Sequence, residues 1–117
     1  MQLSELIKSQ IDADERRGFS VNLASDIERH DQLMRDLVGL VSEVGEFADS
    51  LKKVGLAVST PGYQGPSLSD ATPQLRSELA DVSIYVFRLI TILDGDLENE
   101  IVRKMKINSE RYQYLER

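Results

Sequence analysis

Two apolar stretches with helical periodicity constrain the fold of this chain more than any other feature of its sequence. They span Leu37–Lys53 and Leu75–Leu93, and each includes a pair of carboxylates three residues apart. The pairs are Glu43 and Glu46 in the first stretch, which also contains Asp49, and Glu78 and Asp81 in the second. Because an α-helix turns by about 100° per residue, side chains three residues apart lie on the same face. Each stretch therefore predicts a helix with a pair of acids on one side.

Two such helices facing each other would gather the four carboxylates inside a helical bundle. Buried negative charges repel one another and are tolerated only where cations neutralise them. Ligands that are all oxygen suit a hard cation, Mg²⁺ or Mn²⁺. The pattern therefore predicts a metal site between the two helices. The alternative is that the four acids are ordinary surface residues of two amphipathic helices.

Composition narrows the possible functions. The chain has 117 residues, which is the size of a single domain, residues 1–117. Its net charge of −6 argues against binding to duplex DNA, which requires a basic face. It has no Cys for thiolate catalysis, and no apolar run approaches the roughly 18 residues of a membrane span. Its N-terminal segment lacks a signal-peptide pattern, so we expect a cytoplasmic protein with no membrane partner.

The rest of the pattern predicts an all-α fold, a bundle of four to five helices. Apolar residues at helical spacing predict a first helix within residues 1–13. A capping box at Ser25 predicts a second helix over residues 25–54, with Gly55 as its stop. A helix of that length could be interrupted near His30, at His30–Asp31.

Residues 55–72 are rich in Gly, Pro and Ser and predict a flexible loop. A loop of this length in a small domain is usually functional or mobile. Thr72 would cap the third helix, which would place Pro73 in its first position and run to Leu93. This helix is apolar on almost every side, which predicts a central position or a subunit interface.

The last helix is expected to begin after an N-cap at Asp96 and to span residues 97–114. Lys104, Asn108 and Arg111 form a stripe along it, beside the apolar side of the helix. Long cationic side chains at such positions can reach a phosphate group. Alternatively, they extend to water or bind the terminal carbonyls of their own helix.

Few aromatic or imidazole groups are available to contact an organic ligand. His30, the only His, could contact a nucleobase, and Tyr63 or Phe47 could stack on one. Their alternative roles are a partly buried polar group for His30, loop packing for Tyr63 and core packing for Phe47. A ferritin-like di-iron bundle would also use carboxylates on helices, but it needs Glu-x-x-His pairs, which a single His cannot provide.

Three short segments resemble a known family when taken in order. They are EVGE at residues 43–46, ELAD at residues 78–81 and KMKINSERY at residues 104–112. Together they resemble the MazG-like all-α nucleoside triphosphate pyrophosphohydrolases, in the branch that includes the dCTP pyrophosphatases. The resemblance covers residues 37–112, about two thirds of the chain.

The resemblance implies an Mg²⁺-dependent enzyme that hydrolyses a (deoxy)nucleoside triphosphate to the monophosphate and pyrophosphate. It implies metal ligands at Glu43, Glu46, Glu78 and Asp81, with Glu46 or Glu43 as the catalytic residue that activates water. It implies phosphate contacts from Lys104, Asn108 and Arg111, and we add His30 and Tyr112 as further substrate contacts. Family members form homodimers or homotetramers, and the expected role is removal of unwanted or surplus nucleotides.

The sequence departs from the family pattern in two respects. Many relatives read E-E-x-x-E in the first motif, whereas Ser42 precedes Glu43 here. This departure leaves the number of metal ions and the choice of base open. Trp, which many relatives use to hold the nucleobase, is absent, so base preference is also open. The alternative functions are a non-catalytic helical interaction module and an inactive family member.

Overall fold

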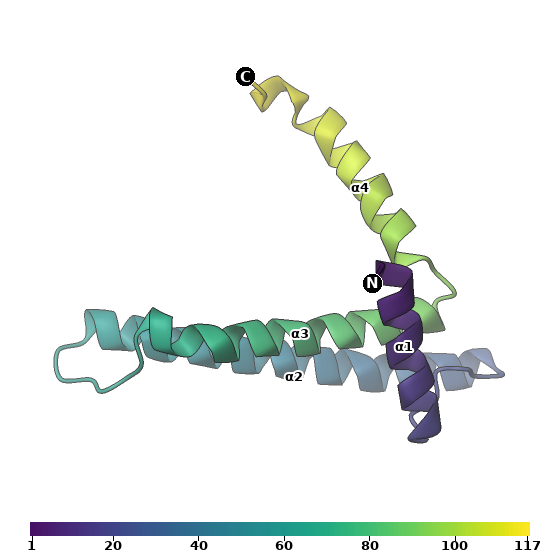
Figure 1. The fold of residues 1–117 in the computed structure, drawn as a ribbon, viewed down its shortest axis with the longest axis horizontal. Helices are drawn as coiled ribbons and strands as arrows, with labels where there is room; N and C mark the ends of the chain where they lie inside the picture. Colours follow the sequence, from purple (N-terminus) through teal and green to yellow (C-terminus); the bar gives the residue numbers. More distant parts are fainter.

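The structure is a computed structural model that describes all 117 residues, and it is all-α, as the sequence predicts (Figure 1). It contains four α-helices and no β-strand. The helices are α1 (Leu3–Arg16), α2 (Asp26–Ser59), α3 (Leu68–Ile92) and α4 (Leu97–Arg111), and a short 3₁₀ turn, η1 (Gln113–Leu115), follows them. None of these helices has an apolar run long enough to traverse a bilayer.

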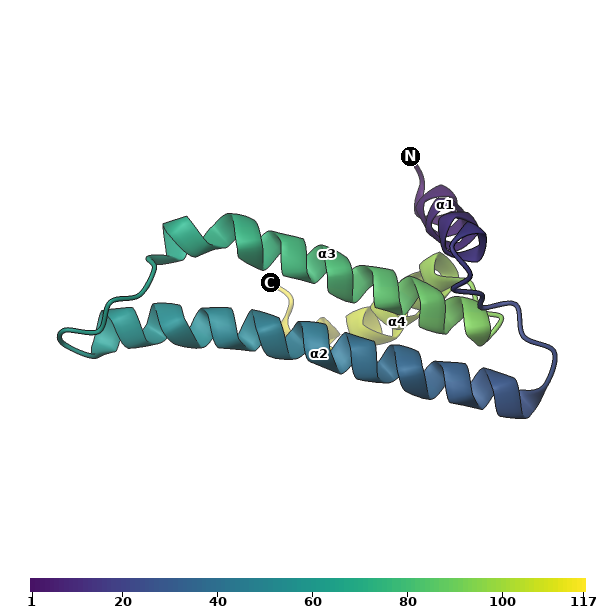
Figure 2. The ribbon, with the colours of Figure 1, turned by 90° about the horizontal axis from the view of Figure 1, so that it is seen from below.

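Helices α2 and α3 form a long antiparallel hairpin, side by side in both views (Figures 1 and 2). Near the connecting loop, Val54, Ala71 and Leu75 form a small buried cluster against which Phe47 packs. Further along, the helices approach closely because Gly39 has no side chain, and a Cβ there would overlap the ring of Tyr85. The hairpin is therefore the element on which the four predicted acids are displayed.

The start of α2 agrees with the sequence, but its end does not. The Ser25 hydroxyl accepts a hydrogen bond from the Glu28 N–H at 3.2 Å, as the capping box predicts. The helix shows no break at His30 and continues past Gly55 to Ser59, whose hydroxyl donates to the Gly55 carbonyl at 2.9 Å. A glycine inside a helix costs only about 1 kcal/mol. The burial of Val54 at the hairpin core offsets that cost.

The predicted loop at residues 55–72 is wrong in its bounds, because only residues 60–67 lie outside the helices. Helix α3 begins at Leu68 and is capped by Ser67, whose hydroxyl accepts from the Asp70 N–H at 3.1 Å. Thr72 is therefore not the N-cap, and Pro73 lies inside the helix rather than in its first position. The last helix also ends earlier than predicted, at Arg111, where the chain tightens into η1.

A buried ionic cluster attaches α1 to the hairpin. Arg88 of α3 donates from Nε to Asp36 of α2 at 3.0 Å and from Nη1 to Asp14 of α1 at 3.0 Å. The same Nη1 donates to the Phe19 carbonyl at 2.9 Å, which fixes the connector after α1. Burial alone would lower the pKa of Arg88, but its hydrogen bonds to the two carboxylates raise it, so the guanidinium stays charged.

Helix α4 leaves the end of the hairpin and projects away from it (Figure 1). None of its residues is buried. The radius of gyration is 18.4 Å, compared with about 13 Å for a compact domain of this length. Only nine residues of the chain are buried. A single copy therefore does not enclose a core of ordinary size.

We expect Arg88→Ala to lower the free energy of unfolding by about 3–5 kcal/mol, because it leaves Asp14 and Asp36 without their buried cation. Urea unfolding followed by circular dichroism at fixed protein concentration measures this loss. The matched control is Arg103→Ala, which breaks an exposed pair with Glu100 on α4 and should cost no more than about 1 kcal/mol. Equal losses for the two variants would show that the cluster does not hold α1 in place.

Candidate metal centre and adjoining cavity

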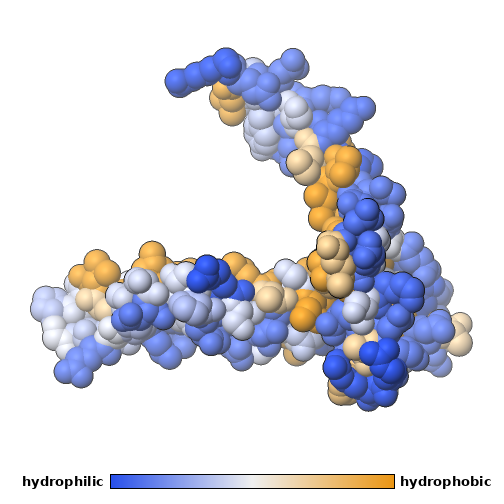
Figure 3. Space-filling view, in the orientation of Figure 1, coloured by the Kyte–Doolittle hydropathy of each residue, from blue (hydrophilic) through white to orange (hydrophobic).

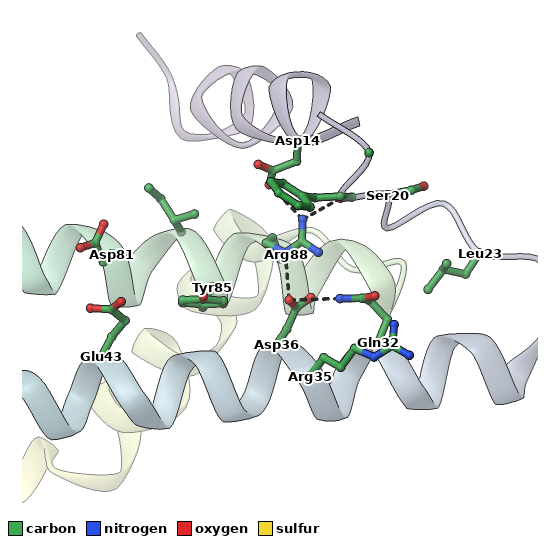
Figure 4. A pocket seen from close by; sticks show the side chains of 13 residues that line it. Asp14, Ser20, Leu23, Gln32, Arg35, Asp36, Glu43, Asp81, Tyr85 and Arg88 are labelled. Carbon is green, nitrogen blue, oxygen red and sulfur yellow. Dashed lines mark hydrogen bonds and ion pairs between the residues drawn. The ribbon is translucent and has the colours of Figure 1, made fainter. Parts of the chain in front are cut away.

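The four predicted acids lie along one seam of the hairpin. Figure 4 shows Glu43 of α2 and Asp81 of α3 facing each other across the gap between the helices. The pKa of Glu43 is raised above its ordinary value, first by burial and then by the negative charges of Glu46, Asp81 and Glu78. The other three carboxylates are therefore close enough to Glu43 for their charges to affect it.

Two carboxylate oxygens in this place are buried and have no hydrogen-bond partner: Oε2 of Glu43 and Oε2 of Glu78. Glu78 is only 4% exposed. Its other oxygen accepts hydrogen bonds from Ser50 Oγ at 3.4 Å and from Gln74 Nε2 at 3.3 Å, so the carboxylate is held in position. A buried anionic oxygen without a donor is costly, and a bound cation would remove that cost.

The donor set fits a hard divalent ion in chemistry, because all four candidate ligands are carboxylates. In this conformation, no three acidic side chains converge closely enough to coordinate one ion. Glu46 and Asp81 are exposed on their helices, so their side chains are free to turn toward an ion.

A cavity of about 750 Å³ adjoins this place and extends along the hairpin to the Arg88 cluster (Figure 4). Phe19 of the connector closes one side, Gln32 and Arg35 line it from α2, and Tyr85 lines it from α3. This volume lies within the range of about 300–1,000 Å³ that is usual for small-molecule sites. Glu43 and Asp81 lie at one end of the cavity, and the other end holds the Arg88 cluster together with Gln32 and Arg35 (Figure 4). The lining is therefore mainly polar and charged.

The structure does not bring the predicted phosphate-binding residues to this cavity within one chain. Lys104, Asn108 and Arg111 lie exposed on α4, and Tyr112 follows at its end, where the Arg111 guanidinium stacks over the Tyr112 ring. His30 is exposed near the start of α2, with Nδ1 3.7 Å from a carboxylate oxygen of its neighbour Asp31, and does not line the cavity. Their roles in substrate binding stay predictions.

The aromatic candidates also lie outside the cavity. Phe47 packs on the small core near the loop, and Tyr63 lies in the loop itself. Sequence reasoning missed the residues that do form the cavity, above all Arg88 and Tyr85. A signal for Arg88 was present, since it is the only Lys or Arg in the apolar stretch 79–93 and a cation in such a stretch requires a buried acidic partner.

Comparison of the chain with protein-family models, with curated proteins and with solved structures gives no match. The features with the clearest chemical meaning are the four carboxylates, the two unpartnered oxygens among them and the cavity alongside.

We expect Glu43→Gln to raise the melting temperature of the metal-free protein at neutral pH. Because the pKa of Glu43 is raised on folding, its contribution to stability is most favourable below the ordinary value of 4.5 and is lost as the pH rises through the raised value. The difference in melting temperature between wild type and variant should therefore widen from acidic to neutral pH.

Differential scanning calorimetry in EDTA measures this difference, with Glu116→Gln, an exposed acid beyond α4, as the control. Saturating Mg²⁺ should narrow the difference, because a cation that binds only the folded wild type stabilises it. A pH-independent difference would mean that Glu43 does not experience the other three charges.

Proposed function

We propose that this protein is an Mg²⁺-dependent hydrolase, with Mn²⁺ as a possible substitute, that converts a (deoxy)nucleoside triphosphate to the monophosphate and pyrophosphate. The observation that carries the proposal is the pair of buried, unpartnered oxygens of Glu43 and Glu78. Of these two acids, Glu43 lines the cavity of about 750 Å³, together with Asp81. The resemblance of residues 43–46, 78–81 and 104–112 to MazG-like pyrophosphohydrolases supports the same conclusion and implies the MazG-like bundle as the fold.

The charges of substrate and site explain the need for a metal. A triphosphate is strongly anionic, and it would be repelled by four carboxylates unless divalent ions reversed the local sign. Mg²⁺ held by Glu43, Glu46, Glu78 and Asp81 would neutralise the developing charge on the phosphoryl oxygens and lower the pKa of bound water. The helices hold these carboxylates on a rigid frame, which suits a reaction that depends mainly on positioning and electrostatics.

The acids of the seam would have different roles in the reaction. Glu78 is fixed by Ser50 and Gln74 and would act as an anchored ligand. Glu46 is exposed beside the buried pair, and either Glu46 or Glu43 would orient or deprotonate the attacking water. Neither task requires Ser42, which replaces an acid of the family pattern.

The cavity beyond the carboxylates would hold the nucleoside. Tyr85 and Phe19 offer aromatic faces, and Gln32 offers an amide that already donates to Asp36 at 3.3 Å. A nucleobase could stack on such a face while its phosphates point back to Glu43 and Asp81. The protein would act in the cytoplasm as a homodimer or homotetramer and clear unwanted nucleotides from the pool.

A second function is favoured by the exposed apolar residues of α2 and α4, among them Val38 and Met105, each 65% exposed. Exposed apolar faces of this kind also occur in non-catalytic modules that bind a partner helix. A module of this type, or an inactive family member, predicts no metal-dependent turnover. It would tolerate Glu78→Gln without loss of partner binding.

We expect the protein to release pyrophosphate from one or a few members of a panel of ribo- and deoxynucleoside triphosphates with Mg²⁺, and from none with EDTA. Glu78→Gln should lower kcat by about 100-fold or more, because it removes an anchored metal ligand. Circular dichroism should show unchanged helix content, and Glu5→Gln on the exposed side of α1 should leave the rate unchanged.

Near wild-type turnover of Glu78→Gln would contradict the metal assignment. Absence of release from every substrate, with and without Mg²⁺, would favour the interaction module.

A further inference from the structure

Asp36 of α2 has a carboxylate oxygen for which the chain supplies no donor. The residue is 4% exposed, and its Oδ2 is buried without a hydrogen-bond partner. Its Oδ1, by contrast, accepts from Arg88 Nε at 3.0 Å and from Gln32 Nε2 at 3.3 Å. An ionised carboxylate only accepts hydrogen bonds, and a buried acceptor without a donor is costly. Because Asp36 lines the cavity, a ligand that carries an N–H group could supply the missing donor.

The charged residues of the cavity form two layers, which are seven residues apart on each helix. Glu43 and Asp81 form the first layer, and Asp36 and Arg88 form the second, with Tyr85 between them (Figure 4). Residues seven apart lie on the same face of a helix and about 10 Å apart along its axis. A nucleotide whose phosphates lie at the first layer would therefore extend its base toward the second.

The cavity selects its ligand mainly by hydrogen bonds. Figure 3 shows apolar side chains gathered along the edges of the hairpin and of α4, whereas most residues that line the cavity are polar or charged. An apolar pocket discriminates weakly between rings of equal shape, but a site with buried polar groups rejects a ligand that leaves them unpaired. The free oxygen of Asp36 is such a group.

Gln32 places a donor beside this acceptor. Its amide nitrogen carries two hydrogens, and one of them is used in the bond to Asp36 Oδ1. The second hydrogen is free, and Gln32 also lines the cavity. The second layer therefore presents an acceptor and a donor next to each other.

We propose that Asp36 is a specificity-determining residue, whose Oδ2 accepts a hydrogen bond from the exocyclic amino group of a nucleobase while Gln32 donates to the neighbouring ring nitrogen. This inference rests on the proposed hydrolysis of a nucleoside triphosphate and assigns the class of base. Cytosine and adenine carry an amino group next to a ring nitrogen that accepts. Uracil and hypoxanthine carry a carbonyl next to a ring N–H, so they would set an acceptor against Oδ2 and a donor against Gln32.

Nucleotides that differ only at this edge of the base test the assignment. In wild type, kcat/KM should be about 10- to 100-fold higher for dCTP than for dUTP, and for dATP than for deoxyinosine triphosphate. Asp36→Asn replaces Oδ2 by an amide donor and leaves Oδ1 to accept from Arg88. Both ratios should therefore fall by about 10-fold or more in this variant.

Asp14→Asn is the matched control, because Asp14 binds the same guanidinium and is also buried, at 6% exposed. Both of its oxygens already have donors, from Gln10 Nε2 and from Arg88 Nη1, each at 3.0 Å. The control weakens the same ionic cluster without changing a free acceptor. Its kcat/KM ratios should stay close to those of wild type, even if its stability falls as much as that of Asp36→Asn.

Binding without turnover separates this assignment from the proposed hydrolysis. In isothermal titration calorimetry with Mg²⁺, dCMP should bind wild type about 10-fold or more tightly than dUMP, and Asp36→Asn should remove most of that difference. The same pattern in a protein that releases no pyrophosphate would retain the role of Asp36 and reject the hydrolase.

Equal or lower kcat/KM for the amino-bearing member of both pairs would overturn the role of Asp36 and leave the hydrolase in place. Equal loss of selectivity in Asp36→Asn and Asp14→Asn would also overturn it, because selectivity would then depend on the shape of the ionic cluster. Absence of both binding and hydrolysis for all of these nucleotides would overturn both proposals.

Discussion

Charge along the seam between α2 and α3 is the constraint on which the rest of the structure depends. At one end of the seam, Arg88 neutralises Asp36 and Asp14 in a buried, hydrogen-bonded cluster. At the other end, Glu43 and Glu78 have buried oxygens without a donor. Buried charge is stable only where it is paired. The same two helices therefore hold one acidic cluster for which the chain supplies a cation, Arg88, although Asp36 Oδ2 has no hydrogen-bond partner, and one for which the chain supplies none.

The Arg88 cluster also helps to form the cavity that adjoins Glu43 and Asp81. Because Arg88 binds Asp14 and the Phe19 carbonyl together, α1 and its connector are held over the hairpin, and the cavity forms beneath them. The Arg88 cluster thus forms one wall of the candidate cavity. Because Arg88 pairs with both Asp14 and Asp36, the cluster adds less negative charge to the seam than two unpaired acids would.

Sequence reasoning predicted what depends on local pattern and missed what depends on distant partners. The helical fold and the cap at Ser25 follow from periodicity and spacing. Gly55 is not the stop that the sequence predicts, because the cost of a glycine in a helix is local, whereas the burial of Val54 that offsets this cost depends on residues of α3. Arg88 was missed because its partners lie 52 and 74 residues away. No local rule pairs residues at such separations.

Helix α4 is a second case in which local pattern does not predict distant contacts. Its periodicity separates an apolar side from a cationic stripe, but it cannot say what packs against the apolar side. The separation has a chemical consequence. Cations that folded onto the carboxylates of their own chain would form salt bridges with them and weaken both metal and phosphate binding. The hydrogen-bonded turn at Asp94 directs α4 away from the hairpin of its own chain, so this competition does not arise within one copy.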